Sequence, residues 1–157
     1  MTTAASTGFV QCGCGCRHWG RFGAAGLLLA RPGTGEVFLQ LRAPWVHTPN
    51  TWGTPGGARD SHETAVDTAL REAREENAID PAGVEVVDVL RTLDHQHWSY
   101  DLVLGLLRHG EPTPQSSESS AAGWFAPDQV PGLDLHPGFR SSWPQARGAV
   151  ERALQPV

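Results

Sequence analysis

The spacing of apolar residues changes several times along the chain, and each change predicts an element of secondary structure. Residues 22–30 are small or apolar without polar alternation, which is typical of a strand buried on both faces. Residues 36–42 alternate, and the Pro- and Gly-rich turn between the two segments predicts a hairpin. Further strands are expected at 51–53, 84–93, 97–107 and 124–125.

Two segments show the three- and four-residue apolar spacing of amphipathic helices. The first, 62–77, has Asp60 or Ser61 as its expected N-cap, and Pro81 stops any continuation. The second helix is expected at 141–154. Because strands precede and follow the first helix, the order predicts an α+β or α/β sandwich, with a mixed β-sheet between helices.

The length of 157 residues suits one ordinary domain with a single core. Residues 1–20 differ from the rest in composition and are expected to form a Cys-rich arm, either flexible or an edge strand, ahead of one domain at 21–157. Residues 110–122 are rich in Ser, Pro and Gly, so they are predicted to form a long loop of the kind that is often functional.

The charge distribution excludes several classes of partner. A net charge of -5 argues against binding a nucleic-acid polymer, which usually selects a basic surface. The chain has no apolar run of membrane-spanning length and no signal-peptide pattern at its start, so we expect a cytoplasmic protein without a membrane partner. Lysine is absent, so contacts to an anionic ligand would fall to Arg, backbone amides and metal.

All three cysteines lie in the arm, at Cys12, Cys14 and Cys16, with His18 close behind. Their odd number indicates reduced thiols in place of a disulfide framework. Three thiolates and an imidazole could also bind Zn²⁺, although zinc sites usually use a C-x₂₋₄-C spacing. Both interpretations stay open from the sequence.

The first predicted helix carries an unusual cluster of acidic residues. At about 100° per residue, Glu72, Glu75 and Glu76 fall within an arc of roughly 100° beside the apolar stripe. Like charges this close repel, and a divalent cation with oxygen ligands would compensate them. The alternative is that Arg71 and Arg74 form ordinary ion pairs with these glutamates on an exposed helix.

The segment around this cluster favours the metal site. Gly57 is followed after five residues by Glu63, and after seven more by Arg-Glu-Ala-Arg-Glu-Glu-Asn-Ala-Ile at 71–79. This arrangement resembles the Nudix box, G-x₅-E-x₇-R-E-U-x-E-E-x-G-U with U apolar. The lead-in Trp-Gly-Thr-Pro-Gly-Gly at 52–57 also resembles that family. One position departs: Ala78 stands where the family has Gly, at a point that commonly needs a left-handed backbone, which Asn77 could adopt instead.

The resemblance implies a Nudix-type α/β/α sandwich and roles for individual residues. Glu75 and Glu76 would bind Mg²⁺, which Mn²⁺ could replace, and Glu72 would be a metal ligand or general base. Arg71 would orient these glutamates, Glu63 would support them as a structural acid, and Gly56 would offer its backbone carbonyl to the metal. Glu118, in the Ser-rich loop, resembles the family's loop acid and would be a metal ligand or base, against the alternative of a solvated side chain.

Candidate substrate contacts lie in loops and strands expected to face the helix. Aromatic rings with polar edges suit stacking on a nucleobase, and an arginine suits a phosphate. Trp98 and Tyr100 share one face of a strand, so a core position is an equal alternative for them. The candidates are Arg42, Trp45, His47, His95 and Trp98.

These inferences predict a Mg²⁺-dependent pyrophosphohydrolase. It would cleave a nucleoside diphosphate linked to another moiety, such as a nucleoside triphosphate, an oxidised nucleotide or a nucleotide sugar, by attack of a metal-activated water. Its partner would be a small nucleotide, and a homodimer is compatible with the sequence. One alternative is a Nudix-like sensor that binds a nucleotide without cleaving it. Another is isomerisation of an isoprenoid diphosphate, which the confinement of the cysteines to the arm disfavours.

Overall fold

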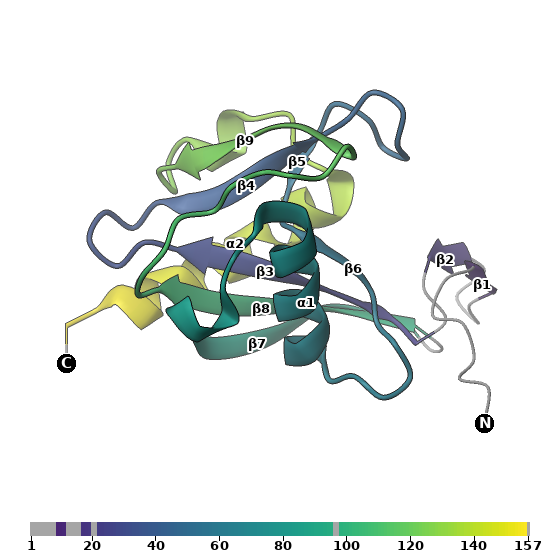
Figure 1. Cartoon of the computed structure of the whole chain (residues 1–157), viewed down its shortest axis with the longest axis horizontal. Coiled ribbons are helices and arrows are strands. Elements are labelled where there is room, and N and C mark those ends of the chain that lie inside the picture. Colours follow the sequence, from purple (N-terminus) through teal and green to yellow (C-terminus); the bar gives the residue numbers. More distant parts are fainter. Residues whose placement is uncertain (1–8, 12–16, 20–21, 96–97, 157) are drawn as a thin grey trace.

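The computed structural model describes residues 9–11, 17–19, 22–95 and 98–156. Its main body is a seven-stranded sheet with α1 (Ala65–Asn77) on one face and α2 (Pro137–Leu154) on the other, as Figure 1 shows. The predicted class, α+β with a mixed sheet between helices, is therefore confirmed.

The centre of the sheet is the parallel pair of β3 (Ala24–Ala30) and β8 (Trp98–Leu107), which are aligned from Ala24 opposite Tyr100 to Ala30 opposite Leu106. All other pairings in this sheet are antiparallel, so the sheet is mixed. The strand order is β5-β4-β3-β8-β7, with β6 beside β3 and β9 beside β4. The remaining strands are β4 (Val37–Arg42), β5 (Trp52–Gly53), β6 (Gly56–Ala58), β7 (Val84–His95) and β9 (Ser119–Phe125).

Successive residues of β3 point to opposite faces of the sheet and join different cores, as period-two geometry requires. Leu27 and Leu29 pack with Ala69 and Ala73 of α1, whereas Leu28 packs in the core that contains the buried residues of α2. A strand covered on both faces has no polar side, which explains the unbroken apolar run in the sequence.

The helix that carries the glutamates begins three residues later than the sequence suggested. Thr64 is its N-cap: the Thr64 hydroxyl accepts from the Asp67 N–H at 3.1 Å, and the Asp67 carboxylate accepts from the Thr64 N–H at 3.0 Å. This reciprocal capping box satisfies two backbone donors, which explains why it prevails. The expected caps were wrong: Asp60 instead belongs to a turn in which its N–H donates to Glu63 Oε1 at 3.0 Å, and Ser61 precedes the helix.

The helix ends at the position where the box departs from the family pattern. Ala78 adopts the left-handed conformation with φ 52° and ψ 32°, and its N–H donates to the Arg74 carbonyl at 2.9 Å. The suggestion that Asn77 would take this conformation was wrong, because Asn77 is the last helical residue and is fully buried. An alanine therefore accepts the steric cost that a glycine would avoid.

Two other boundaries differ from the sequence prediction. The last strand, β9, begins at Ser119 and pairs with β4 through small residues that carry no apolar alternation, so the loop before it is shorter than expected. The C-terminal helix, α2, begins at Pro137, because proline is well tolerated in the first turn of a helix, where its missing N–H has no partner to lose.

At the N-terminus, β1 (Phe9–Gln11) and β2 (Arg17–Trp19) form a separate antiparallel pair and do not join the main sheet. The suggested zinc ligands Cys12, Cys14 and Cys16 lie outside the described residues, as does the side chain of His18. Within the described residues, no helix is long and apolar enough to cross a membrane.

Candidate active site

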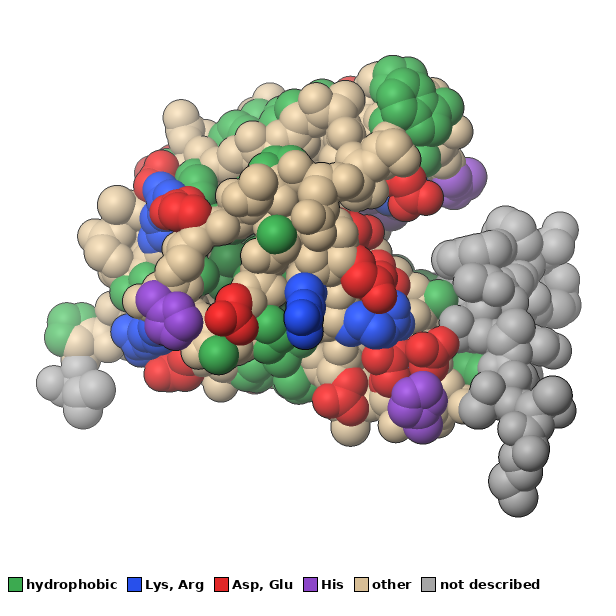
Figure 2. All heavy atoms as spheres, viewed as in Figure 1, with side chains coloured by type: hydrophobic (Ala, Val, Ile, Leu, Met, Phe, Trp, Pro, Cys, Tyr) green, Lys and Arg blue, Asp and Glu red, His purple; other side chains and the backbone are tan. Residues whose placement is uncertain are grey.

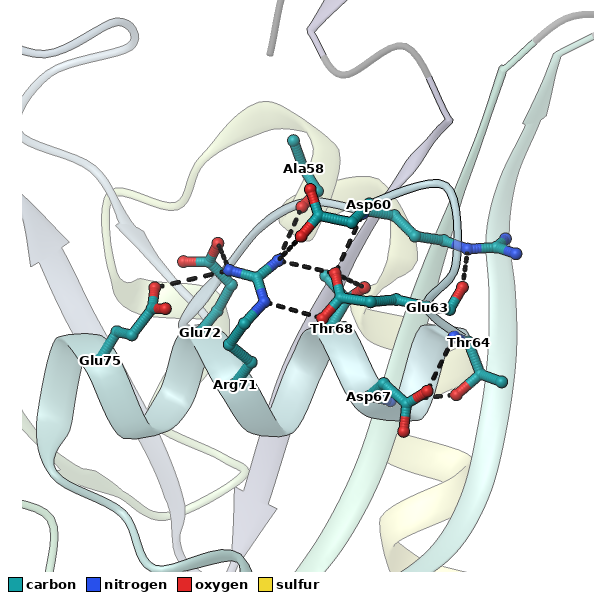
Figure 3. A network of polar contacts seen from close by, with 10 residues as sticks. Ala58, Asp60, Glu63, Thr64, Asp67, Thr68, Arg71, Glu72 and Glu75 are labelled. Carbon is teal, nitrogen blue, oxygen red and sulfur yellow. Dashed lines mark hydrogen bonds and ion pairs between the residues drawn. The ribbon is translucent and has the colours of Figure 1, made fainter. Parts of the chain in front are cut away.

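Arg71 is the centre of a polar network on α1, drawn in Figure 3. Its Nε and Nη2 donate to the two oxygens of Glu63, both at 2.8 Å, and Nη2 also donates to the Ala58 carbonyl at 3.2 Å. Nη1 donates to Glu72 Oε1 at 3.0 Å and more weakly to Glu75 Oε2 at 3.5 Å. One guanidinium thus fixes the loop before α1 and two carboxylates on α1.

Glu63 is the buried anchor of this network, with 8% of its surface exposed. The hydrogen bond from Arg71 lowers the pKa of Glu63 to about 2, and the Asp60 N–H and Thr68 hydroxyl contribute in the same direction. The same pairing raises the pKa of Arg71 above its ordinary value. Glu63 therefore stays ionised, and the charge-assisted bidentate geometry makes it a rigid support.

Glu76 has the most strongly altered acidity of the glutamates on α1. Burial raises the pKa of Glu76 to about 8, and the negative charge of Glu72 adds to the shift. Two hydrogen-bond donors oppose this rise in pKa: Gln40 Nε2 and the Gly56 backbone N–H each lie 3.2 Å from Glu76 Oε2. Partial burial and a neighbouring carboxylate both disfavour the ionised form of Glu76. The anion is therefore stable only when a counterion binds it.

Glu72 lies against Gly57 of the glycine turn. Burial raises the pKa of Glu72, with a further contribution from the charges of Glu75 and Glu118 that Arg71 partly offsets. The backbone of Gly57 passes so close that a Cβ there would lie 2.6 Å from Glu72 Oε1. Only glycine leaves room for this carboxylate at the end of the β6 turn.

Each of the three glutamates has one oxygen bound by the protein. Glu72 Oε1 and Glu75 Oε2 accept from Arg71, and Glu76 Oε2 accepts from Gln40 and Gly56. The second oxygens accept no hydrogen bond from the residues that the structure describes. These remaining carboxylate oxygens fit a divalent cation such as Mg²⁺, which prefers hard oxygen ligands.

The carboxylates are nevertheless not gathered at coordination distance. Within the described ranges, no three His, Cys, Asp or Glu side chains form a group that could already hold a metal ion. Two of them are held by different donors: Glu75 accepts a hydrogen bond from Arg71, and Glu76 accepts one from Gln40. On the surface, acidic side chains gather beside basic ones over the α1 face (Figure 2).

Glu118 reaches this cluster from the loop before β9. The loop is attached to the C-terminal end of α1, where Gln115 Nε2 donates to the carbonyls of Arg74 at 3.1 Å and Glu75 at 2.9 Å. These bonds satisfy carbonyls that a helix end leaves without partners. Glu118 itself is exposed, yet its charge contributes to raising the pKa of both Glu72 and Glu76, which places it on the same side as the cluster.

A pocket of about 220 Å³ adjoins the cluster, between the sheet and the start of α2. Gly56 and Gly57 form its border with the glutamates. Of the expected substrate contacts, Arg42 and Trp98 line the pocket, and Tyr100 lines it as well as packing against the core. Trp45 is 72% exposed, and it, His47 and His95 do not line this pocket.

Sequence reasoning missed several polar residues of the pocket, among them Gln40, His136 and Ser142. Gln40 could have been noticed as the amide in an otherwise apolar strand. His136 and Ser142 lie far from the motif in sequence, and no local pattern marks them.

His136 has a defined protonation state. Its Nδ1 accepts from the Gly138 N–H at 3.1 Å, and its backbone N–H donates to the Trp52 carbonyl at 2.8 Å. Burial lowers the pKa of His136, and the positive charges of Arg42 and His47 lower it further. Because Nδ1 is an acceptor, the neutral ring carries its proton on Nε2, which is left as a hydrogen-bond donor.

Comparison with known proteins agrees with this geometry. The family model described as "NUDIX domain" matches residues 20–145. The Mycobacterium tuberculosis protein named "Putative 8-oxo-dGTP diphosphatase 3" is 44% identical over 150 residues, which are 90% of this chain and 69% of that protein. A Bifidobacterium longum protein named "Nucleoside triphosphate pyrophosphatase/Nudix hydrolase fusion protein" is 40% identical over 146 residues, 88% of this chain and 30% of that one.

Solved structures agree as well. A Nudix hydrolase from M. smegmatis superimposes with a TM-score of 0.84 at 39% identity, and the alignment covers 96% of this chain and 97% of that one. A C. elegans Ap4A hydrolase, at 20% identity and a TM-score of 0.68, shares the fold over 82% of this chain and 98% of its own. With the box residues gathered on α1 and a family match across most of the chain, this protein belongs to the Nudix hydrolase family.

Proposed function

We propose that this Nudix hydrolase is a Mg²⁺-dependent pyrophosphohydrolase that cleaves nucleoside triphosphates with an oxidised or carbonyl-bearing purine, releasing the nucleoside monophosphate. The observation that carries the proposal is the position of Glu76: a carboxyl group with its pKa raised to about 8, beside Glu72, whose hydrogen-bond donors Gln40 and Gly56 line the adjoining pocket. Such perturbed acids in a cleft are typical of functional sites.

Three glutamates on α1 have separate tasks in this proposal. Glu75 and Glu76 bind the cation, and Glu72 completes its ligand set from the inner side of the helix. Bound Mg²⁺ neutralises negative charge on the diphosphate and makes a water more acidic. Arg71 holds the inner oxygens of Glu72 and Glu75 in place, and Glu63 holds Arg71. The Gly56 carbonyl is a further ligand from the turn that touches Glu76.

Glu118 accepts the proton of the attacking water. Its carboxylate has no ion-pair partner among the described residues, whereas Glu72 and Glu75 are both paired with Arg71. It comes from a different element from the three glutamates, the loop attached to the end of α1 through Gln115. Carboxylates are among the side chains that act as general bases in enzymes.

The pocket favours a single nucleobase. Pockets for drug-sized ligands commonly measure about 300–1,000 Å³, and this one measures about 220 Å³. It has aromatic walls at Trp98, Tyr100 and Phe139, and a hydrogen-bond donor at His136. Both halves of a dinucleotide would not fit in it. The printed names of the relatives from M. tuberculosis and B. longum, which refer to 8-oxo-dGTP and to nucleoside triphosphates, support the same substrate class.

The test is an assay with Mg²⁺, coupled to pyrophosphatase and phosphatase so that products are read as phosphate, over canonical and oxidised nucleoside triphosphates, nucleotide sugars, ADP-ribose and dinucleoside polyphosphates. Uncoupled reactions are analysed for monophosphate and pyrophosphate. We expect the highest kcat/KM for an oxidised purine triphosphate. Glu76→Gln should abolish turnover, while the matched variant Glu151→Gln, on the exposed side of α2, should keep it. No turnover by the wild-type protein, combined with calorimetric nucleotide binding, would contradict the proposal and indicate a sensor.

A further inference from the structure

Gln40 is a buried amide between the metal-binding helix and the sheet. It lies on β4, is 7% exposed, and bridges two residues of α1 that are adjacent in sequence. Its Nε2 lies 3.2 Å from Glu76 Oε2, and its Oε1 accepts from Asn77 Nδ2 at 2.9 Å. A buried amide without such partners would cost several kcal/mol, so both ends of the side chain are committed.

The neighbouring side chains determine the orientation of the Gln40 amide group. When Glu76 is ionised, as metal binding requires, its carboxylate only accepts hydrogen bonds, so the amino group of Gln40 must face it. Its carbonyl then faces Asn77, which must present its own amino group. This arrangement leaves Asn77 Oδ1 buried and without a hydrogen-bond partner among the described residues. An unsatisfied buried acceptor is tolerated when it supports a functional geometry.

The two oxygens of Glu76 differ in their hydrogen bonds. Gln40 and the Gly56 N–H both donate to Oε2, from β4 and from the β6 turn respectively. No donor from the described part of the chain reaches Oε1. Two donors therefore hold one oxygen of Glu76, and the other oxygen is left for a different partner.

We infer that Gln40 is a positioning residue for metal binding: it holds Glu76 by one oxygen so that the other is presented to the divalent cation, and Asn77 acts on the cation only through Gln40. The inference rests on the proposed function in taking Glu76 as a metal ligand. Partners that orient metal ligands in this way are commonly worth about 10–100-fold in metal affinity or activity.

The direct test is Mn²⁺ affinity of the nucleotide-free protein, measured by electron paramagnetic resonance. Gln40→Met replaces the amide with a side chain of similar volume and removes only the hydrogen bonds. We expect its Mn²⁺ Kd to rise about 10–100-fold. Gln145→Met, at an exposed position on α2, is the matched control and should leave Kd unchanged. Thermal unfolding of each variant with chelator verifies that the fold is intact.

A double-variant cycle tests the route through Asn77. Asn77→Ala removes the donor to Gln40 without touching Glu76, so it should weaken Mn²⁺ binding, and combined with Gln40→Met it should add nothing. An unchanged Kd in Gln40→Met would overturn the inference and leave the proposed function standing. Absence of Mn²⁺ binding by the wild-type protein would overturn both. Changes in Kd without wild-type hydrolysis would contradict only the proposed function.

Discussion

The Cα of Gly57 faces the carboxylate of Glu72, and an added Cβ would lie 2.6 Å from both Cδ and Oε1 of that residue. Real Cβ atoms do not approach this closely, so any side chain at residue 57 must displace Glu72 or the turn. The contact explains on steric grounds why a glycine begins the box. It links the backbone of β6 to the position of a carboxylate 15 residues later on α1.

Gly57→Ala should therefore reduce activity strongly while the protein still folds. Displacement of a catalytic group by about 1 Å can cost about 100-fold in rate, so we expect a loss of that order in kcat/KM. Gly33→Ala is the control, because a Cβ there would meet nothing within 4 Å. Steady-state kinetics and thermal unfolding measure the two effects. Activity of Gly57→Ala within twofold of wild type would contradict the steric account.

Ala78→Gly should stabilise the protein. The left-handed backbone of Ala78 costs a residue with a Cβ about 1–2 kcal/mol, and glycine avoids this cost but loses part of the gain through its more flexible unfolded chain. We expect a net gain of about 1 kcal/mol in the free energy of unfolding, measured with urea. Ala82→Gly, at an exposed position with ordinary φ, should not be stabilising.

The sequence reveals those residues of the site that are close together along the chain and misses those that are far apart. Glu72, Glu75 and Glu76 share one helix, so spacing alone places them on one face. The side chains that complete the site come from other elements, and sheet pairing brings them together: Gln40 from β4 and His136 from the start of α2. No periodicity in the sequence encodes such pairing.

The elements of the fold also differ in how well the sequence predicts them. The strands with strong apolar patterns, β3 and β8, were predicted well, whereas β9 was predicted too short because its pairing with β4 depends on backbone hydrogen bonds between small residues. The cap at Thr64 was missed because Asp67 completes a capping box that competes with the preceding turn. Local rules identify the elements, and the competition between neighbouring caps sets their ends.

The stability of the metal-free protein should fall as pH rises from 4.5 to about 8. In this window the unfolded chain has released the proton of Glu76, whose ordinary pKa is 4.5, whereas the folded protein keeps it because burial raises the pKa to about 8. The folded state binds more protons, so the free energy of unfolding decreases with rising pH. Unfolding in chelator at several pH values measures this slope.

Glu76→Gln should reduce that slope, since the amide does not titrate and only the smaller contribution of Glu72 remains, while Glu151→Gln should retain it. Mg²⁺ should stabilise the wild-type protein most at the upper end of the window, because a cation binds the ionised carboxylate. A wild-type slope that survives unreduced in Glu76→Gln would assign the titration to another group.

Glu118→Gln should separate proton transfer from metal binding. A general base commonly contributes about 100- to 10,000-fold, so we expect kcat to fall by about that range, with Mn²⁺ affinity nearly unchanged. Glu111→Gln, in the same loop and paired with Arg31, is the control and should keep full activity. A parallel loss of Mn²⁺ affinity in Glu118→Gln would identify Glu118 as a metal ligand and contradict its role as base.

Substitutions of His136 test how the nucleobase of the substrate is recognised. Its Nδ1 caps α2 and the residue lines the pocket, so we expect its Nε2–H to donate to a carbonyl of the nucleobase and not to an amino group. Asn and Asp both serve well as N-caps, but only Asn also donates. His136→Asn should therefore keep a preference for guanine-type over adenine triphosphates, and His136→Asp should lose or reverse it.

The measured quantity is the ratio of kcat/KM for the two nucleotides, because a general repulsion between the introduced carboxylate and the phosphates affects both substrates equally and cancels. Leaving a buried polar group unpaired costs about 1–3 kcal/mol, so the ratio should change about tenfold or more between the Asn and Asp variants. If His136 only capped the helix, both variants would show the wild-type ratio. That outcome would place recognition of the base on other polar side chains of the pocket, such as Tyr100 and Ser142.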